Sequence, residues 1–274
     1  MTTSDFLVFI LLTAAMGLSI FLSLPIILLK RLASRTITFL NAIAIGILIF
    51  LLADIFSDLA PVIASSTEYF TNGWLDLAFI ISMTLIFALL YLIDQRPPLP
   101  EPTHQESSPG ATTPLDSTIR NPTRLALIIA IGIGLQNLTE GLFFGGNWST
   151  GTIGLLSVTF AGFFLQNVTE GFPIVSPYLG ERFKSIYVVC GLFLVGSLPT
   201  IAGGAFGYFY PDQNSVFTTV IDALAIGAIL YCLLPMVKVA LRSEATRLLT
   251  YYKHRLVYFG ILAGFLLGFA VNAF

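Results

Sequence analysis

A polar five-residue motif occurs twice, thirty positions apart, in stretches that are otherwise apolar. The first copy reads QNLTE from Gln136 to Glu140, the second reads QNVTE from Gln166 to Glu170, and each is followed by glycine. On a helix, residues four apart share a face, so each copy presents an amide and a carboxylate side by side. An ionisable group at membrane depth is costly and usually serves an ion or a proton. Two such helices predict one shared cation site.

Six side chains of the two copies supply the oxygen atoms predicted to bind the cation. They are Gln136, Asn137, Glu140, Gln166, Asn167 and Glu170. No Lys, Arg or His lies at matching depth, so these carboxylates are either protonated or balanced by a mobile cation. A structural alternative is that both glutamates are neutral and join the helices by hydrogen bonds to Gln and Asn.

Three further acidic residues, Asp54, Asp58 and Asp222, also lie in apolar segments. Asp54 and Asp58 are four residues apart and therefore share a helix face. They could line a route into or out of the cation site. Exposure of that helix end to an outer vestibule would explain them equally well.

The elements that position these polar side chains are predicted to be membrane-spanning helices. The chain has 274 residues, of which 56% are hydrophobic and only 10% charged, which is unlike a soluble domain. Eight apolar runs are long enough to cross roughly 30 Å of hydrocarbon. They are Phe6–Leu29, Ile37–Ala60, Leu75–Ile93, Leu125–Phe144, Ile153–Tyr178, Ile186–Tyr208, Val216–Val237 and Leu256–Phe274. The expected fold is an all-α membrane protein of eight helices, in which consecutive, antiparallel helices four and five form an inverted-repeat-type site.

The basic residues support this number of helices. All thirteen Lys and Arg residues fall in alternate connections between the eight runs, and the other connections contain none. Basic loops stay in the cytoplasm, so both termini are expected outside.

One connection is long and rich in Pro, Ser and Thr, from position 94 to 123. Such a composition cannot bury enough apolar area to fold, so we expect a flexible cytoplasmic loop within a single membrane domain, 1–274. Cys190 and Cys232 both fall inside predicted spans and are expected to be core residues without a disulfide. Nothing in the charge pattern indicates nucleic-acid binding.

The paired motif resembles the fourth- and fifth-helix signatures of the ZIP (Zrt/Irt-like) divalent-metal transporters, usually His-Asn-x-Pro-Glu-Gly. The family is similar in having eight helices, outside termini and a variable loop after the third helix. The resemblance implies a ZIP-like bundle, and the Gln-Asn form is similar to the GufA-like branch of bacteria and archaea. It therefore implies a multi-pass protein of a prokaryotic cytoplasmic membrane, for which a homodimer is one possible assembly.

The chain departs from the family pattern at several positions. Both motif histidines are glutamine, both motif prolines are Thr139 and Thr169, and Ser197 to Thr200 stands where a sixth-helix glutamate often completes a second metal position. These changes argue against a high-affinity binuclear zinc site. They favour a single oxygen-rich position.

The expected function is transport of divalent metal cations, such as zinc, manganese or iron, by an alternating-access carrier. The metal would be substrate, and no tightly bound cofactor is expected. Alternatives are a carrier for another cation, or a non-transporting membrane receptor or scaffold with this fold. An enzyme is not expected, because no nucleophile or histidine accompanies the paired carboxylates.

Overall fold

The computed structural model describes eight segments of the chain: 3–28, 33–65, 69–94, 122–150, 153–179, 185–211, 215–241 and 247–272. Most of the predicted loop at 94–123 lies outside these residues. The described part is helical throughout and contains no strand. In chain order the elements are α1 (Thr3–Leu18), η1 (Ser19–Leu28), α2 (Ser34–Ser65), α3 (Tyr69–Asp94), α5 (Pro122–Ser149), α6 (Ile153–Val175), η2 (Ser176–Tyr178), α7 (Ile186–Phe209), α8 (Ser215–Ala240) and α9 (Arg247–Asn272).

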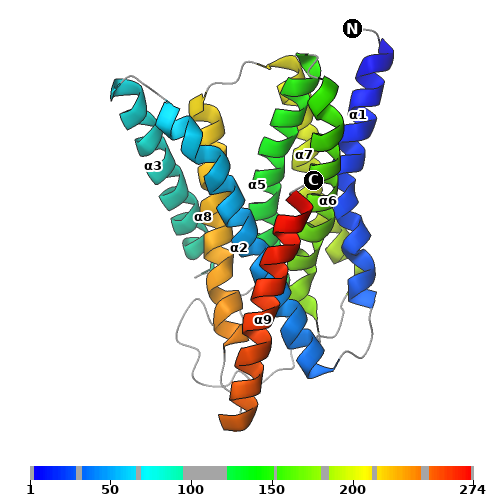
Figure 1. The fold of residues 1–274 in the computed structure, drawn as a ribbon, viewed down its shortest axis with the longest axis vertical. Helices are drawn as coiled ribbons and strands as arrows, with labels where there is room; N and C mark the ends of the chain where they lie inside the picture. Colours follow the sequence, from blue (N-terminus) through cyan, green and yellow to red (C-terminus); the bar gives the residue numbers. More distant parts are fainter. Residues whose placement is uncertain are drawn as a thin grey trace.

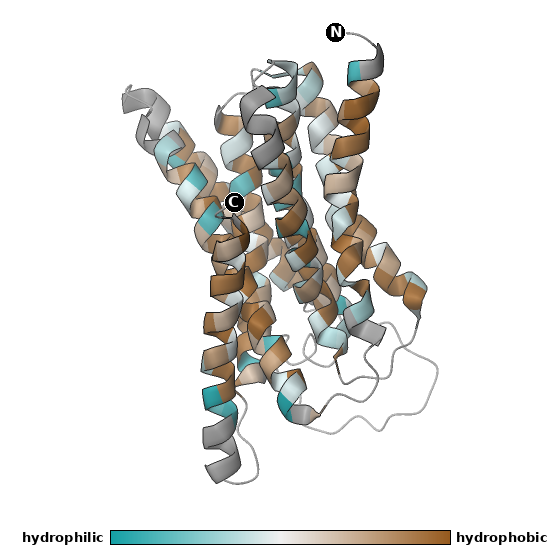
Figure 2. Ribbon diagram, turned by 45° about the vertical axis from the view of Figure 1, so that its right-hand side comes forward, coloured by the Kyte–Doolittle hydropathy of each residue, from teal (hydrophilic) through white to brown (hydrophobic). Residues whose placement is uncertain are grey.

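Each of the eight predicted spans coincides with one of these helices. Seven helical segments are long and apolar enough to cross a membrane, and all of the predicted spans except Ile153–Tyr178 are among them. That span corresponds to α6 and η2, which pack against α5 and η1 inside the bundle. Apolar residues cover most of the length of the helices (Figure 2). The chain is thus a multi-pass helical membrane protein by length and composition.

The helices pack in pairs that are mostly distant in sequence (Figure 1). The most extensive contacts are those of α5 with α7, α2 with α9, α3 with α8, α5 with α8, and α6 with η1. The α5 helix also packs on α6 and on α8, so α5 lies in the interior of the bundle. Its sequence explains this position, because more than half of its residues are buried and most of the buried ones are small or apolar.

The first predicted span differs from the expectation of one continuous α-helix. The chain changes from α-helix to 3₁₀-helix at Ser19 and continues in that form to Leu28, with Pro25 inside the segment. Runs of 3₁₀-helix longer than three or four residues are uncommon. The hydroxyl of Ser19 lies 2.7 Å from the Met16 carbonyl and 2.9 Å from the Phe164 carbonyl of α6, so a side chain holds this change of helix against α6.

The predicted span Ile153–Tyr178 contains Pro173 and Pro177, and its helix changes form near them. A proline inside a helix removes a backbone hydrogen bond. The α6 helix ends at Val175, two residues after Pro173, and continues as the short 3₁₀ turn η2, which contains Pro177. The hydroxyl of Ser176 donates to the Pro173 carbonyl at 3.0 Å, which satisfies one of the exposed carbonyl groups.

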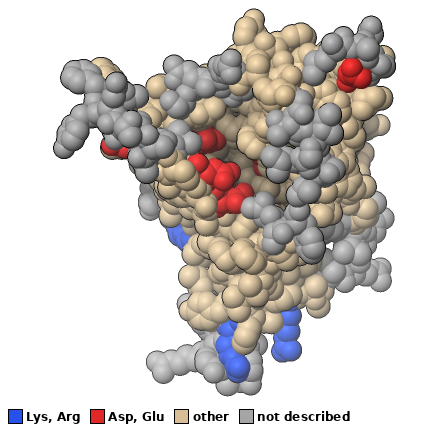
Figure 3. All heavy atoms as spheres, turned by 45° about the horizontal axis from the view of Figure 1, so that its top comes forward, with Lys and Arg blue, Asp and Glu red and all other residues tan. Residues whose placement is uncertain are grey.

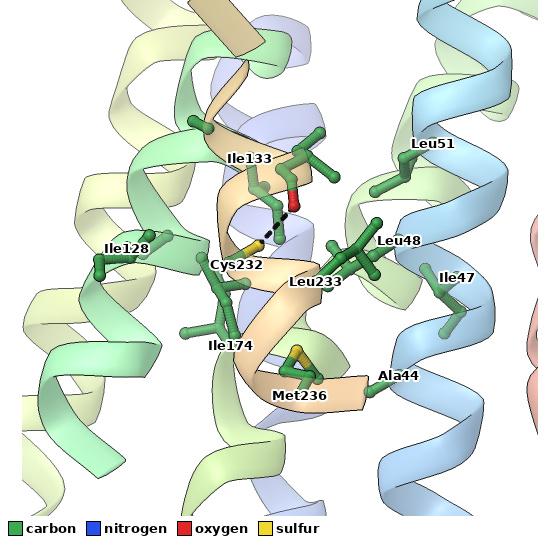
Figure 4. Close-up of a cluster of buried hydrophobic side chains, with 14 of the residues drawn as sticks. Ala44, Ile47, Leu48, Leu51, Ile128, Ile133, Ile174, Cys232, Leu233 and Met236 are labelled. Atoms are coloured by element: carbon green, nitrogen blue, oxygen red, sulfur yellow. Dashed lines mark hydrogen bonds between the residues drawn. The ribbon is translucent and has the colours of Figure 1, made fainter. Parts of the chain in front are cut away.

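The main hydrophobic core lies where α2, α5, α6 and α8 meet (Figure 4). Figure 4 shows isoleucines of α5 and α6 facing Leu48 of α2 and Cys232 of α8. Ile133, Ile174, Leu48 and Cys232 are all fully buried. Both cysteines are free; Cys232 is buried in the core as expected, whereas Cys190 is only partly buried.

Glycines bring α5 and α7 into backbone contact. A Cβ atom on Gly141 or Gly145 of α5 would overlap a carbonyl oxygen of α7, and one on Gly203 or Gly207 of α7 would overlap a carbonyl oxygen of α5. Both helices thus carry glycines four residues apart, the spacing that lets membrane helices approach closely. This contact fixes α5 beside α7 at the level of the polar motif.

Candidate functional site

The structure brings the two copies of the polar motif together. The amide nitrogen of Asn137 donates to Asn167 Oδ1 at 2.8 Å, and Gln166 Nε2 donates to Glu140 Oε1 at 2.7 Å. These bonds join α5 to α6 across thirty and twenty-six residues of sequence. The two copies are therefore in direct contact, which a shared site would require.

All six predicted ligands lie in the interior. Their exposed fractions range from 0% for Asn137, Asn167 and Glu170 to 7% for Glu140. Among the side chains that the structure describes, these two glutamates are the only buried charged residues, and no Lys, Arg or His is buried with them. A pair of carboxylates without a basic partner is costly unless protons or a bound cation compensate their charge.

Each motif positions its own side chains in the same way. Thr139 Oγ1 lies 2.7 Å from the Gln136 carbonyl oxygen, and Thr169 Oγ1 lies 2.7 Å from the Gln166 carbonyl oxygen. Such bonds from threonine to the preceding turn can bend a helix slightly. The structure therefore gives the two threonines, which replace the prolines of the resembling family, one shared local role.

The glycine after each motif allows a second helix to approach. A Cβ on Gly141 would meet the carbonyl of Thr200 on α7, and a Cβ on Gly171 would meet Ser23 and the Ile20 carbonyl of η1. Both glutamates are thus followed by a position where only glycine fits without displacing a neighbour. This packing holds α5 and α6 between α7 and η1.

The hydrogen bonds at the site leave a set of oxygen atoms without donors. Within the described part of the chain, five buried oxygen atoms of the motif accept no hydrogen bond. They are Gln136 Oε1, Asn137 Oδ1, Gln166 Oε1 and both carboxylate oxygens of Glu170. The amides of Asn137 and Gln166 lie near Glu170, but not in good hydrogen-bonding geometry. Buried oxygens without donors are rare in folded proteins, and a bound ion or water is one ordinary reason for them.

Further acidic side chains lie toward one end of the bundle. Figure 3 shows Asp and Glu side chains gathered in a hollow there, while Lys and Arg side chains lie at the opposite end. Asp54 is close enough to Glu140 and Glu170 for their charges to interact, and Asp58 is similarly close to Glu140 and Asp222. The acids that the sequence placed in α2 and α8 therefore belong to the same polar region as the motif.

Contacts from α7 and α8 could not be found from sequence spacing. The hydroxyl of Thr139 lies near the carboxylate of Asp222, and Asn137 donates to the Gly196 carbonyl at 3.0 Å. Ser197 and Thr200 of α7 are fully buried, and their hydroxyl oxygens have no hydrogen-bond partner among the described residues. The only sequence signal for these two was the position where the resembling family often has a glutamate.

The site does not contain the ligands of a typical transition-metal centre. No group of three or more His, Cys, Asp or Glu side chains in the described segments is arranged to hold a metal ion. A cation bound between α5 and α6 would have to use amide oxygens besides the carboxylates. Such oxygen ligands suit hard cations such as Mg²⁺, Ca²⁺ and Mn²⁺.

The comparisons with known proteins do not assign the chain. It matches no protein-family model, and the search of curated proteins finds no match. The chemistry of the site and the arrangement of the helices therefore carry the functional argument.

Proposed function

We propose that this protein is a carrier for divalent metal cations, which it binds between α5 and α6. The observation that carries the proposal is Glu170: its carboxylate is 0% exposed, and neither oxygen accepts a hydrogen bond from any described residue. A buried carboxylate in that state is unfavourable by several kcal/mol, on the order of a broken buried ion pair. A bound cation would offset that cost, whereas a purely structural glutamate would be expected to have donors.

An acidic hollow at the surface supports transport rather than storage of an ion. The hollow in Figure 3 lies at the end of the bundle away from the basic residues. Asp54 is close enough to Glu140 and Glu170 for their charges to interact. Clefts lined by charges of one sign raise the local concentration of counter-ions. With basic loops in the cytoplasm, the hollow would face outside.

The other side of the site is closed by apolar residues. From the motif, α5 leads back through Ile133 and α6 leads on to Ile174, and both side chains are fully buried in the main core. The cation would thus meet polar groups on one side and a packed apolar barrier on the other. Because the six motif side chains are at most 7% exposed, passage of an ion would require a rearrangement of helices.

The helix packing indicates which elements would move together. The glycine contacts join α5 closely to α7, and α6 packs along η1, whereas α2 packs chiefly with α9. If α5 and α6 move as a rigid unit, α7 and α1 would therefore move with them more readily than α2 would.

The resemblance to ZIP transporters agrees with this proposal in helix number, in the position of the paired motif and in the class of substrate. The replacement of both motif histidines by Gln136 and Gln166 favours a lower affinity and weaker discrimination against hard ions than a histidine site would give. Zinc, manganese and iron all remain candidate substrates, because intrinsic affinities favour zinc over manganese even at oxygen sites.

Uptake into proteoliposomes tests the proposal. Purified full-length protein would be reconstituted and offered Mn²⁺, Fe²⁺, Zn²⁺, Co²⁺, Cd²⁺ and Mg²⁺ separately, with empty liposomes as the blank. Saturable uptake of at least one of these ions, lost in Glu170→Gln and retained in Asp76→Asn, is the expected result. Asp76 is an exposed acid of α3 and therefore controls for the loss of one negative charge. Absence of uptake for all six ions would favour a receptor or scaffold, or a carrier of another cation.

A further inference from the structure

The two buried glutamates have unequal surroundings. Glu140 Oε1 accepts hydrogen bonds from Gln136 Nε2 at 3.2 Å and from Gln166 Nε2 at 2.7 Å. Its other oxygen, Oε2, accepts from Asn167 Nδ2 at 3.5 Å. Glu170, by contrast, accepts none from any described residue. The sequence motif is symmetric, but the environments of its two carboxylates are not.

These bonds orient the two glutamines. A side-chain amide is planar, with its NH₂ donor and its carbonyl acceptor on different sides of the terminal carbon. Because Gln136 and Gln166 both direct NH₂ groups to Glu140, their carbonyl oxygens are turned away from it. Both carbonyl oxygens are buried and without donors in the described structure.

Asn137 extends the same pattern. Its NH₂ group donates to Asn167 Oδ1 at 2.8 Å and to the Gly196 carbonyl at 3.0 Å, which leaves its own Oδ1 open. The open oxygens of the motif therefore belong to three amides and one carboxylate.

Glu140 is poorly placed to bind a cation itself. Three amide NH₂ groups surround its carboxylate, and their hydrogens carry partial positive charge that would repel an approaching cation. A metal could reach Glu140 only by displacing these donors, which would then be buried without acceptors. At Glu170 the amides of Asn137 and Gln166 lie nearby, but neither carboxylate oxygen accepts a hydrogen bond in good geometry, so a cation would have no formed bond to break there.

We propose that Glu140 is a positioning residue and that Glu170 is the carboxylate that contacts the cation. This inference rests on the proposed function. Glu140 holds Gln136 and Gln166 by their NH₂ groups so that their carbonyl oxygens, together with Glu170, face the ion. The role corresponds to that of outer hydrogen-bond partners that fix the ligands of metal sites.

The division of roles also narrows the substrate class. One contacting carboxylate with amide carbonyl oxygens forms an all-oxygen, weakly charged site, which suits a hard cation that keeps part of its hydration. Mn²⁺ is the useful probe among such ions, because it also binds nitrogen and carboxylate sites of carriers for softer metals.

Metal binding and infrared spectroscopy of four variants test this inference on the purified full-length protein. The variants are Glu170→Gln, Glu140→Gln, Glu140→Leu and the exposed control Asp76→Asn. Mn²⁺ affinity is measured by titration, and the Mn²⁺-induced infrared difference spectrum reports the stretching bands of any carboxylate that contacts the metal. Thermal unfolding of each variant without metal establishes that it is folded.

Glu170→Gln should weaken Mn²⁺ binding by about 100-fold or more, as expected when one partner of a buried charged contact is removed. It should also remove the metal-induced carboxylate band. Glu140→Gln keeps one carbonyl oxygen that can accept from Gln136 and Gln166, so its affinity should stay within about tenfold of the unmodified protein and the band should persist. Glu140→Leu, which has no acceptor, should bind more weakly than Glu140→Gln. Asp76→Asn should change neither property.

Different failures separate the inference from the proposed function. Loss of the carboxylate band in Glu140→Gln, with affinity reduced as much as in Glu170→Gln, would make Glu140 a direct ligand and overturn the inference while the carrier proposal stands. Equal binding by Glu140→Leu and Glu140→Gln would show that Glu140 does not position the glutamines. An unmodified protein that binds none of the six divalent ions would overturn both.

Discussion

The backbone contact between α5 and α7 gives the sharpest quantitative prediction. Gly145 and Gly146 are adjacent on α5, yet their surroundings differ. A Cβ on Gly145 would overlap the Gly204 carbonyl oxygen and lie 2.8 Å from the Tyr208 nitrogen, whereas the nearest atom to a Cβ on Gly146 is 3.7 Å away. Alanine should therefore be tolerated at position 146 and force the helices apart at position 145.

The expected difference in the free energy of unfolding follows from a comparison of Gly145→Ala with Gly146→Ala. Replacing glycine by alanine inside a helix favours folding by roughly 0.5–1 kcal/mol, and this gain is common to Gly145→Ala and Gly146→Ala. Overpacking a well-packed interior costs about 1–3 kcal/mol, and only Gly145→Ala carries this cost. The difference between the variants should thus be about 1–3 kcal/mol, which corresponds to roughly 2–12 °C in melting temperature.

Thermal unfolding of the full-length protein in detergent measures this difference, with the folded fraction followed by size-exclusion chromatography. Gly146→Ala should melt at or slightly above the temperature of the unmodified protein, and Gly145→Ala clearly below it. Gly162→Ala provides a second control, because no atom lies within 4 Å of its added Cβ. Identical melting temperatures for Gly145→Ala and Gly146→Ala would refute the close approach of α5 and α7.

Three further outcomes are expected. Gln136→His combined with Gln166→His should raise Zn²⁺ affinity more than Mn²⁺ affinity in a competition titration. This gain in affinity should fade below about pH 6.5, because imidazole must lose its proton to bind metal. Unchanged relative affinities would show that these side chains do not touch the ion. With both native cysteines removed, a cysteine at the exposed position Thr150 should react with an impermeant maleimide only from outside, and one at Leu241 only from inside; labelling of both from one side would contradict the topology. Ser19→Ala removes the hydroxyl that donates from η1 to a main-chain carbonyl of α6. It should destabilise the protein by about 0.6 kcal/mol, the average for hydrogen bonds between membrane helices. Ser19→Thr, which keeps the hydroxyl, should have the melting temperature of the unmodified protein.

The sequence by itself determined the membrane class and the helices. Each predicted span overlaps an observed α-helix, and seven of the eight are long and apolar enough within the described residues to cross a membrane. A segment that crosses hydrocarbon must be apolar over a fixed length and must satisfy its own backbone hydrogen bonds. The grouping of Gln136 with Glu140 was also available, since it depends only on the helical repeat. A loosened end of α6 was also expected from Pro173 and Pro177. Pro199 and Pro235, by contrast, lie inside α7 and α8 without ending either helix.

Only the tertiary structure decided how these helices meet and what each polar group does. The pairing of α5 with α7 and of α2 with α9 depends on surfaces far apart in the chain, which no local pattern encodes. The 3₁₀ form of η1 depends on its contact with α6, because the Ser19 hydroxyl reaches a carbonyl 145 residues away. Most importantly, two identical motif positions received different environments: Glu140 accepts hydrogen bonds from three amides, whereas Glu170 accepts none in good geometry from the described residues. Hydrogen bonds between side chains depend on distances across helices, and these distances are fixed only when α5, α6 and α7 pack together.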